Sequence, residues 1–131
     1  MPLDFKKFIT WDIQTDLIHI GQSFYEMLTK NIRVILMIIT ESQRNSQIKE
    51  IIAAVPDRQN EVLAWYFDEQ IKKGNCRKMK DPKFAAQSFF ALFFEYCISE
   101  NMVSVSERKD SKEIAIQFVD LFLYGMVARH N

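Results

Sequence analysis

Few side chains in this sequence have the types and the spacing that catalysis or metal binding would need. The two histidines are His19, within an apolar stretch, and His130, next to the last residue. Neither belongs to a set of cysteine or carboxylate ligands whose spacing stands above chance, so we expect no metal site and no cofactor. Cys76 and Cys97 lack a partner motif, which disfavours a redox switch. The sequence therefore predicts a protein that is not an enzyme, with His19 either in a binding pocket or at the helix surface.

Aromatic side chains offer a different chemistry, which is the binding of an apolar small molecule. They concentrate in three stretches of the chain, which contain Phe24 and Tyr25, Trp65, Tyr66 and Phe67, and Phe89, Phe90 and Phe93. We predict that the ligand-binding residues are Phe24, Trp65, Tyr66, Phe89 and Phe93. Such pockets carry a few polar groups that orient the ligand, here Gln22, Gln59 or Tyr96. The alternative is that aromatic residues at helical spacing only fill the core.

The charges of the chain are balanced and give no long-range field for a polyanion. Lys and Arg together number 17, as do Asp and Glu, so the chain alone is predicted to bind nucleic acid poorly. The densest basic stretch contains Lys72, Lys73, Arg77, Lys78 and Lys80. This stretch is able to meet an acidic ligand, but a solvated loop is the simpler interpretation.

No feature of the sequence directs the chain into a membrane or out of the cell. The most apolar run, residues 81–98, is interrupted by Gln87, Ser88 and Glu95, and so falls short of the roughly 18 apolar residues that a span requires. The opening MPLDFKKF lacks the apolar stretch of a signal peptide. Two cysteines without a disulfide framework are typical of a reducing compartment. We therefore expect a cytoplasmic protein without membrane contact.

The elements that position these side chains are expected to be helices. Only 3 glycines and 3 prolines occur among 131 residues, and apolar residues recur every three or four positions, which is typical of an all-α domain. We expect one domain over residues 1–131, in which residues 1–11 are a connector. It is predicted to be an antiparallel helical bundle of about five helices, at residues 12–43, 46–54, 56–73, 82–100 and 110–128, with a loop at 103–109. The polar residues 29–31 leave the continuity of the first helix open.

Local signals set the ends of these helices. Pro56 is expected to separate two helices, because the residue before a proline avoids the helical region and proline suits a first turn. Gly74 is expected to close the second of them in a left-handed conformation. Asp81 is the expected N-cap of the next helix, and Asp110 that of the last, where it forms a capping box with Glu113.

The last two helices have more apolar surface than one domain can cover. Their apolar positions extend over about 200° and about 240°, whereas a surface helix needs little more than about 100°. A second copy is the simplest cover, with two helices from each chain forming a four-helix bundle. The predicted dimer interface contains Phe84, Ser88, Ala91, Phe118, Phe122, Gly125 and Met126. The alternatives are a monomer that is covered otherwise or adsorbed to a membrane, and Ser88 and Glu95 equally fit a solvent edge.

The order of these segments resembles a known family. A long helix, a short one, a helix closed by KKGN, then DPKFAAQSFFALFFEYCISENM and EIAIQFVDLFLYGMVA are similar to the C-terminal ligand-binding and dimerisation domain of TetR-family transcriptional regulators. The most specific parts are the DP that opens the penultimate helix and VDLFLYGM in the last. There Gly125 matches a glycine that the family commonly carries. The resemblance covers almost the whole chain.

The resemblance implies a homodimer formed by the last two helices and a pocket for a small hydrophobic effector, whose binding changes the separation of two DNA-reading heads. Only eleven residues precede the first predicted helix, too few for a DNA-binding domain of about 45 to 60 residues. We therefore expect DNA to be bound only through an N-terminal helix-turn-helix domain that this sequence lacks. The second hypothesis is a stand-alone dimeric carrier of a hydrophobic small molecule. An enzyme is disfavoured for want of acid–base or metal groups.

Overall fold

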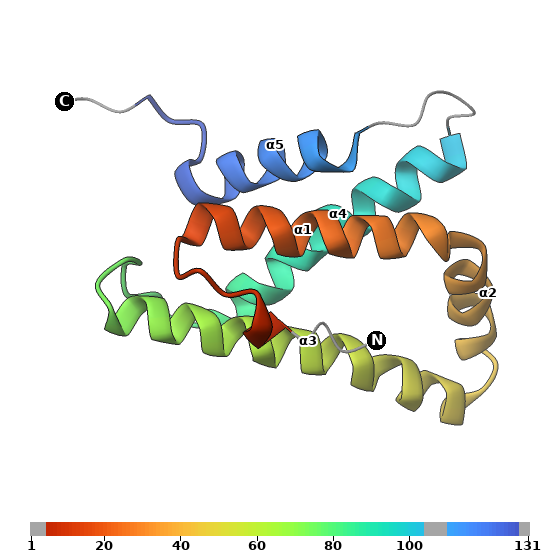
Figure 1. The fold of residues 1–131 in the computed structure, drawn as a ribbon. Coiled ribbons are helices and arrows are strands. Elements are labelled where there is room, and N and C mark those ends of the chain that lie inside the picture. The colour runs from red at the N-terminus through yellow and green to blue at the C-terminus, as the bar shows by residue number, and fades with distance from the viewer. Residues whose placement is uncertain (1–4, 104–109, 129–131) are drawn as a thin grey trace.

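The computed structural model describes residues 5–103 and 110–128, and all regular structure in these residues is helical. The elements in chain order are η1 (Phe5–Lys7), α1 (Ile13–Lys30), α2 (Ile32–Ser42), α3 (Ser46–Lys72), α4 (Pro82–Val103) and α5 (Ser111–Tyr124). Helix α1 packs on α5 and α4, while α3 packs on α4 and α2. Figure 1 shows α1 in front of α4, with α5 above and α3 below. The predicted all-α helical bundle is confirmed.

Side-chain caps fix where several helices begin. Asp81 and Asp110 each accept a hydrogen bond from the backbone N–H two residues later, at 3.0 Å in both cases, as the predicted caps require. Asp12 caps α1 by accepting from the backbone N–H of Thr15, and Asn45 caps α3 by accepting from those of Gln47 and Ile48. Gly74 follows α3 with a φ of 79°, the left-handed conformation that was predicted for it.

The predicted break at Pro56 is wrong. One helix, α3, runs from Ser46 to Lys72 with Pro56 inside it. A proline removes one backbone N–H and crowds the carbonyl four residues earlier, which belongs to Ile52. Residues 53–58 are exposed, so water reaches the freed carbonyl, and the packing of α2 on α3 holds the helix together across the proline.

One boundary that the sequence left open is settled, and one other differs from the prediction. The first long helix divides at Asn31, whose Nδ2 donates to the Met27 carbonyl oxygen at 2.9 Å, so the polar residues 29–31 do break it. The last helix ends at Tyr124 and not near residue 128, because Gly125 has a φ of 68°. Residues 104–109, which form most of the predicted loop, lie outside the described part of the chain.

The core lies where α1, α3, α4 and α5 meet. Apolar residues three or four positions apart are buried along α1, at Leu17, Ile20, Phe24 and Leu28. The largest fully buried side chains elsewhere are Leu63, Tyr66, Phe67, Gln70, Phe89, Phe93, Cys97 and Val119. Within the described residues, no helix is both long and apolar enough to cross a bilayer. The apolar side chains of α4 and α5 lie partly in this core and partly on an exposed face.

Gly21 lies on the buried side of α1, and the ring of Phe93 from α4 fills the space beside it. A Cβ at this position would overlap Cζ of that ring and stand 2.9 Å from its Cε2. The ring has little room to move, because its centroid lies 5.2 Å from that of Phe89 and 4.9 Å from that of Phe118. The close approach of α1 and α4 thus requires a residue without a side chain at position 21.

We predict that Gly21→Ala lowers the free energy of unfolding, because overpacking against Phe93 costs about 1–3 kcal/mol. Alanine favours a helix over glycine by roughly 1 kcal/mol, so the expected net loss is at most about 2 kcal/mol. Chemical denaturation followed by circular dichroism measures the difference. Phe93→Leu is the matched change because it removes the ring edge that the new Cβ would meet. If Gly21→Ala costs as much in the Phe93→Leu background as in the wild type, the overlap is not the cause.

Candidate functional site

Four of the five predicted ligand-binding residues lie together in the core. Phe24, Tyr66, Phe89 and Phe93 come from α1, α3 and α4, and none of them is more than 6% exposed. Trp65 is 37% exposed and belongs to a different cluster, in which its ring contacts that of Trp11 at 6.1 Å. The structure therefore brings four of the predicted residues together and leaves the fifth apart.

The rings of the buried residues pack against one another. The centroid distances are 4.9 Å for Phe24 and Phe90, 5.2 Å for Phe89 and Phe93, and 5.2 Å for Phe89 and Phe122. These are the spacings of edge and tilted contacts in a packed interior. None of the five predicted residues lines either of the two cavities described next. Their packing matches the alternative interpretation, in which the aromatic residues form the core.

The polar groups proposed for the pocket are dispersed. Gln22 Nε2 donates to Glu26 Oε1 at 3.1 Å on the exposed side of α1. His19 is exposed on the same helix, with its ring 5.2 Å from that of Phe8. Gln59 is half-buried on α3, and Tyr96 lines the smaller of the two cavities. His130 lies outside the described residues.

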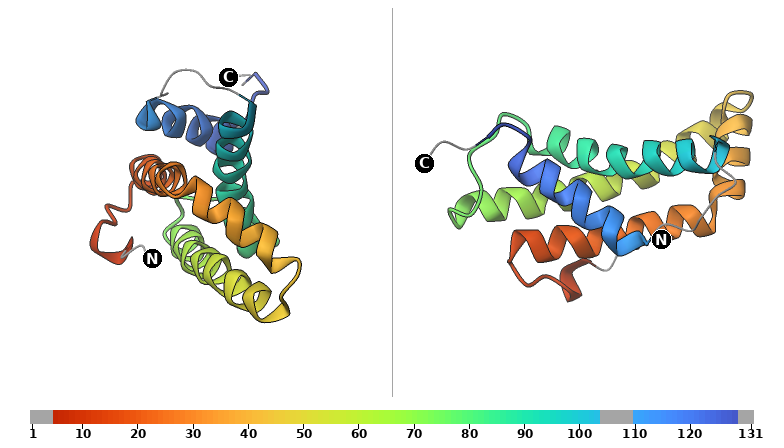
Figure 2. Two further views of the ribbon diagram at one scale, coloured as in Figure 1. Left: turned by 90° about the vertical axis from the view of Figure 1, so that its right-hand side faces the viewer. Right: turned by 90° about the horizontal axis from the view of Figure 1, so that it is seen from above.

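The larger cavity opens at the end of the bundle where α1 begins. The segment between α3 and α4, the start of α4 and the end of α5 come together there (Figure 2). We name this opening the end groove; its volume is about 880 Å³, within the range of small-molecule sites. Its lining residues are Ile13, Phe67, Asn75, Cys76, Arg77, Met79, Lys80, Asp81, Phe84, Ala85, Ser88, Phe122, Leu123 and Tyr124.

The lining of the end groove has a polar side and an apolar side. The segment 75–81 contributes most of the polar groups, and α4 and α5 contribute most of the apolar ones. The Asp81 carboxylate is already engaged, because it caps α4. Arg77 Nη1 donates to the Lys78 carbonyl oxygen at 3.3 Å. Burial raises the pKa of the Cys76 thiol, so this group stays protonated at neutral pH.

The smaller cavity lies between α4 and α5 at the other end of α5, and its volume is about 450 Å³. Its lining residues are Tyr96, Asp110, Glu113, Ile114, Gln117, Phe118 and Leu121. Two carboxylates stand at its edge, and Asp110 among them caps α5. Its volume is about half that of the end groove and its edge is acidic, so it is a poorer site for an apolar ligand than the end groove.

A buried carboxylate joins the segment before α1 to α3. Asp16 is 2% exposed, and its oxygens accept hydrogen bonds from Thr10 N (2.9 Å), Thr10 Oγ1 (2.8 Å), Trp11 N (2.9 Å) and Tyr66 Oη (2.6 Å). Gln70 Nε2 donates to Tyr66 Oη at 2.9 Å and to the Trp11 carbonyl oxygen at 3.0 Å. We name Thr10, Trp11, Asp16, Tyr66 and Gln70 the Asp16 network. Buried polar groups of this kind are stable only when they are fully bonded, as these are.

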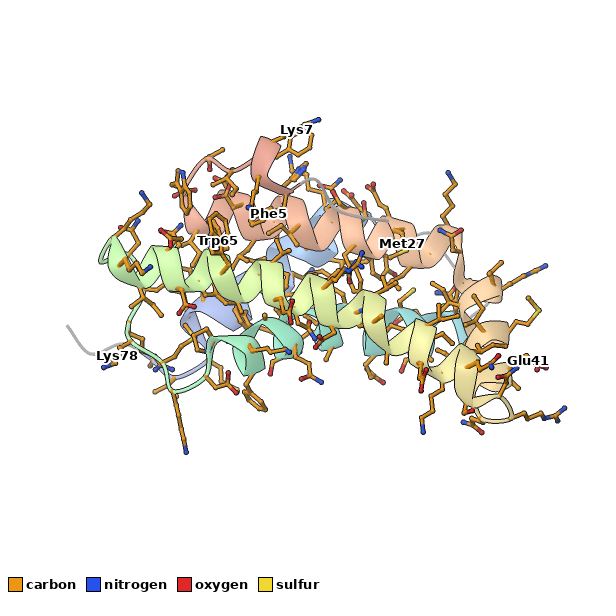
Figure 3. All side chains as sticks on the ribbon, turned by 90° about the horizontal axis from the view of Figure 1, so that it is seen from below. Phe5, Lys7, Met27, Glu41, Trp65 and Lys78 are labelled. Atoms are coloured by element: carbon orange, nitrogen blue, oxygen red, sulfur yellow. The ribbon has the colours of Figure 1, made fainter. Side chains whose placement is uncertain are left out.

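Ring contacts reinforce the Asp16 network at Trp11. This residue has a φ of 66°, a conformation that costs a non-glycine residue roughly 1–2 kcal/mol. Its ring stacks on that of Tyr66 at 5.5 Å, and Lys73 Nζ lies 4.6 Å from its centroid. In Figure 3 the labelled Phe5 lies between the first segment and α3 near Trp65, and its ring meets Tyr66 at 5.0 Å. These contacts offset the backbone strain at Trp11.

Hydrogen bonds to Gln70 connect the Asp16 network to the end groove. Asn75, which lines the groove, donates through Nδ2 to Gln70 Oε1 at 2.8 Å. The backbone N–H of Asn75 also donates to the Gln70 carbonyl oxygen at 2.9 Å. Ile13 lines the groove from the start of α1, directly after the residues that the network holds. The rim of the groove and the segment before α1 are thus fixed by the same glutamine.

The predicted dimer-interface residues fall into two groups. Phe84 (69% exposed) and Met126 (89% exposed) face outward, as does Ala91, while Ser88 is half-buried. Phe118 and Phe122 are half-buried and pack within the chain, on the rings of Phe93 (4.9 Å) and Phe89 (5.2 Å). Gly125 ends α5 with a positive φ, and nothing lies within 4 Å of a Cβ built on it. Within one chain its part is conformational.

Sequence reasoning missed the end groove and the Asp16 network. The groove depends on Ile13 and Met79, which come from separate parts of the chain and carry no local pattern. The network did leave a signal, because Tyr66 and Gln70 lie four residues apart on the apolar face of α3. A polar pair on a buried face requires a polar partner from another element, here Asp16.

No group of three or more His, Cys, Asp or Glu in residues 5–103 and 110–128 is placed to hold a metal ion.

The chain matches the family model of the AefR-like transcriptional repressor C-terminal domain over residues 15–125. Because this match spans most of the 131 residues, the chain belongs to that family of TetR C-terminal domains, which generally bind effectors and form dimers. Comparison with curated proteins and with solved structures gives no match. The resemblance found in the sequence is confirmed.

We predict that Tyr66→Phe lowers the free energy of unfolding by about 1–3 kcal/mol, because it removes one of the hydrogen bonds to the buried Asp16 carboxylate and one of the two acceptors of the Gln70 amide. Urea denaturation followed by circular dichroism measures the loss. Tyr124→Phe is the matched control, since Tyr124 is exposed on α5, and it should change stability by less than about 0.5 kcal/mol. Equal effects of the two changes would contradict the role given to the network.

Alkaline pH should weaken the fold through the same tyrosine. Burial and the bond to the Asp16 carboxylate raise the pKa of Tyr66 above its usual value of 10.0. Its contribution to stability is therefore complete below a pH of about 10 and is lost as pH rises through the higher folded-state pKa. We expect the wild type to lose more unfolding free energy between a pH of about 9 and about 11 than Tyr66→Phe does. Equal losses in the two proteins would show that Tyr66 is not the group responsible.

Proposed function

We propose that this domain is the effector-binding and dimer-forming part of a cytoplasmic TetR-like transcriptional regulator, and that it has a regulatory rather than a catalytic role. It binds a small, largely apolar effector in the end groove and pairs with a second copy through α4 and α5. DNA contact belongs to a helix-turn-helix domain that these 131 residues do not contain. The observation that supports this most directly is that α4 and α5 carry both an exposed apolar surface and the wall of the end groove.

The exposed apolar surface is made of side chains on one side of α4, on α5 and just beyond the end of α5. We name it the apolar strip; it contains Phe84, Leu92, Leu121, Tyr124 and Met126, with the small residues Ser88 and Ala91 between them. Exposed apolar surfaces of this extent commonly mark protein interfaces. A second copy that presents the same strip covers both, because a twofold interface pairs a surface with itself. The half-buried Phe118 and Phe122 supply the edge of this contact and anchor it to the core.

Effector binding and dimer geometry are coupled in this proposal because they share elements. Phe84 and Tyr124 belong to the apolar strip and also line the end groove. Helix α5 packs on α1 and meets α4 through the rings of Phe118 and Phe122, so a displacement of α5 at the groove wall is passed to both helices of the strip. An effector shifts the dimer only by as much as its affinity differs between the two arrangements. Asn75 and Gln70 extend the effect to the segment before α1.

We predict that the chain has twice its monomer mass in solution, measured by light scattering over a dilution series. Leu121→Glu should weaken the dimer about hundredfold, that is by roughly 2.7 kcal/mol, because it places a charge within an apolar contact. Leu121 is 53% exposed and does not line the end groove, so folding and ligand binding are expected to persist.

Ile51→Glu is the control for this experiment. Ile51 is 68% exposed on α3, away from the strip, and its replacement should leave the dimer intact. A wild-type monomer at all concentrations would overturn the proposed interface. So would an unchanged dimer in the Leu121→Glu variant.

A further inference from the structure

The charges around the end groove are not distributed evenly. Arg77 and Lys80 line it from the segment between α3 and α4, and Asp81 is the one acidic side chain in its lining. Phe67, Met79, Phe84, Phe122 and Leu123 line the remainder. A ligand in this groove thus meets cations at one rim and apolar side chains over the rest of its length.

The two cations do not form ion pairs with neighbouring acidic side chains in the described part of the chain. Between residues that the structure describes, Lys72 pairs with Glu69, and Lys83 pairs with Asp57 and Glu61. Neither Arg77 nor Lys80 pairs with an acidic residue in this part of the chain. The Asp81 carboxylate is directed to the backbone N–H of Lys83, where the N-terminus of α4 also attracts its charge. A net positive charge therefore remains at the rim. Arg77 uses Nη1 on the Lys78 carbonyl oxygen and keeps the rest of its guanidinium fork for an anion.

We infer that the end groove selects an amphipathic anion, a molecule with one carboxylate or similar group held by Arg77 and Lys80 and an apolar chain or ring lying on Phe67, Phe84 and Phe122. This inference rests on the proposed function, in which the groove holds the effector. Guanidinium binds carboxylates through two parallel hydrogen bonds, which an ammonium or a neutral head group cannot accept. The groove therefore discriminates by head group, whereas its apolar side tolerates different chains.

Cys76 provides the readout, because it lines the groove and is half-buried, while Cys97 is fully buried. A ligand in the groove slows alkylation of Cys76, which mass spectrometry of the alkylated peptide follows. The probes are decanoate, 1-decanol and decyltrimethylammonium, which share one chain and differ in charge. Each rate is compared with that of the same variant without ligand, so that a change in thiol reactivity caused by the substitution does not enter, and affinities are taken from the concentration at half-maximal effect.

We expect decanoate to protect Cys76 at a concentration about tenfold lower than 1-decanol, and the cation to protect least. The double change Arg77→Gln with Lys80→Gln should remove the difference between decanoate and 1-decanol while leaving protection by 1-decanol unchanged, which also shows that the groove is intact. Lys78→Gln is the matched control. Lys78, labelled in Figure 3, lies on the same segment but does not line the groove, so its replacement should keep the preference for decanoate.

The other outcomes separate this inference from the function on which it rests. Equal protection by decanoate and 1-decanol in the wild type would overturn the selection of anions and leave the apolar site standing. Protection by none of the three probes would overturn both the anion selection and the effector site. A preference for decanoate that survives the double change would overturn the roles of Arg77 and Lys80. A preference lost in Lys78→Gln would show that general charge on the segment, and not the groove, is responsible.

Discussion

The buried carboxylate of Asp16 is the constraint on which the arrangement of this domain depends. A charge 2% exposed requires several donors, and the chain supplies them from Thr10, Trp11 and Tyr66. To meet this requirement the segment before α1 must fold back against α3, even at the cost of a positive φ at Trp11. Gln70 then extends the same set of bonds to Asn75, at the rim of the end groove. One polar requirement thus positions the segment before α1, two helices and one wall of the candidate site.

The apolar surface obeys the opposite constraint, because the chain has more of it than it can bury. Helix α4 gives Phe89 and Phe93 to the core and leaves Phe84 and Leu92 outside, while α5 buries Val119 and exposes Leu121. The long apolar arcs of these helices are therefore divided between two uses. The inward part makes the domain, and the outward part borders both the end groove and the apolar strip. The coupling proposed between effector and dimer rests on this overlap of surfaces.

Much of this fold could be predicted from the sequence, because local signals decided it. The caps at Asp81 and Asp110, the glycine after α3 and the stripe along α1 act within a few residues of chain. The prediction at Pro56 was wrong, because the exposure of the residues around it and the packing of α2 on α3 override the tendency of proline to end a helix. The site was harder, since the end groove exists only where residues 13, 79 and 122 meet. Residue type alone could not decide between a pocket and a core for Phe24, Tyr66, Phe89 and Phe93. Their packing in the structure places them in the core.

The pairing of Trp11 with Trp65 makes the junction between the first segment and α3 optically distinct. The chain has 2 tryptophans, and their ring centroids lie 6.1 Å apart at this one place. Intrinsic tryptophan emission is thus a local signal that reports whether the segment before α1 is docked, and not an average over the whole fold. Lys6 and Lys73 lie over the two rings, so the emission is also sensitive to any displacement of these cations. Tryptophan fluorescence therefore follows the docking of the segment before α1 on α3, at the junction that Trp11 and Trp65 form.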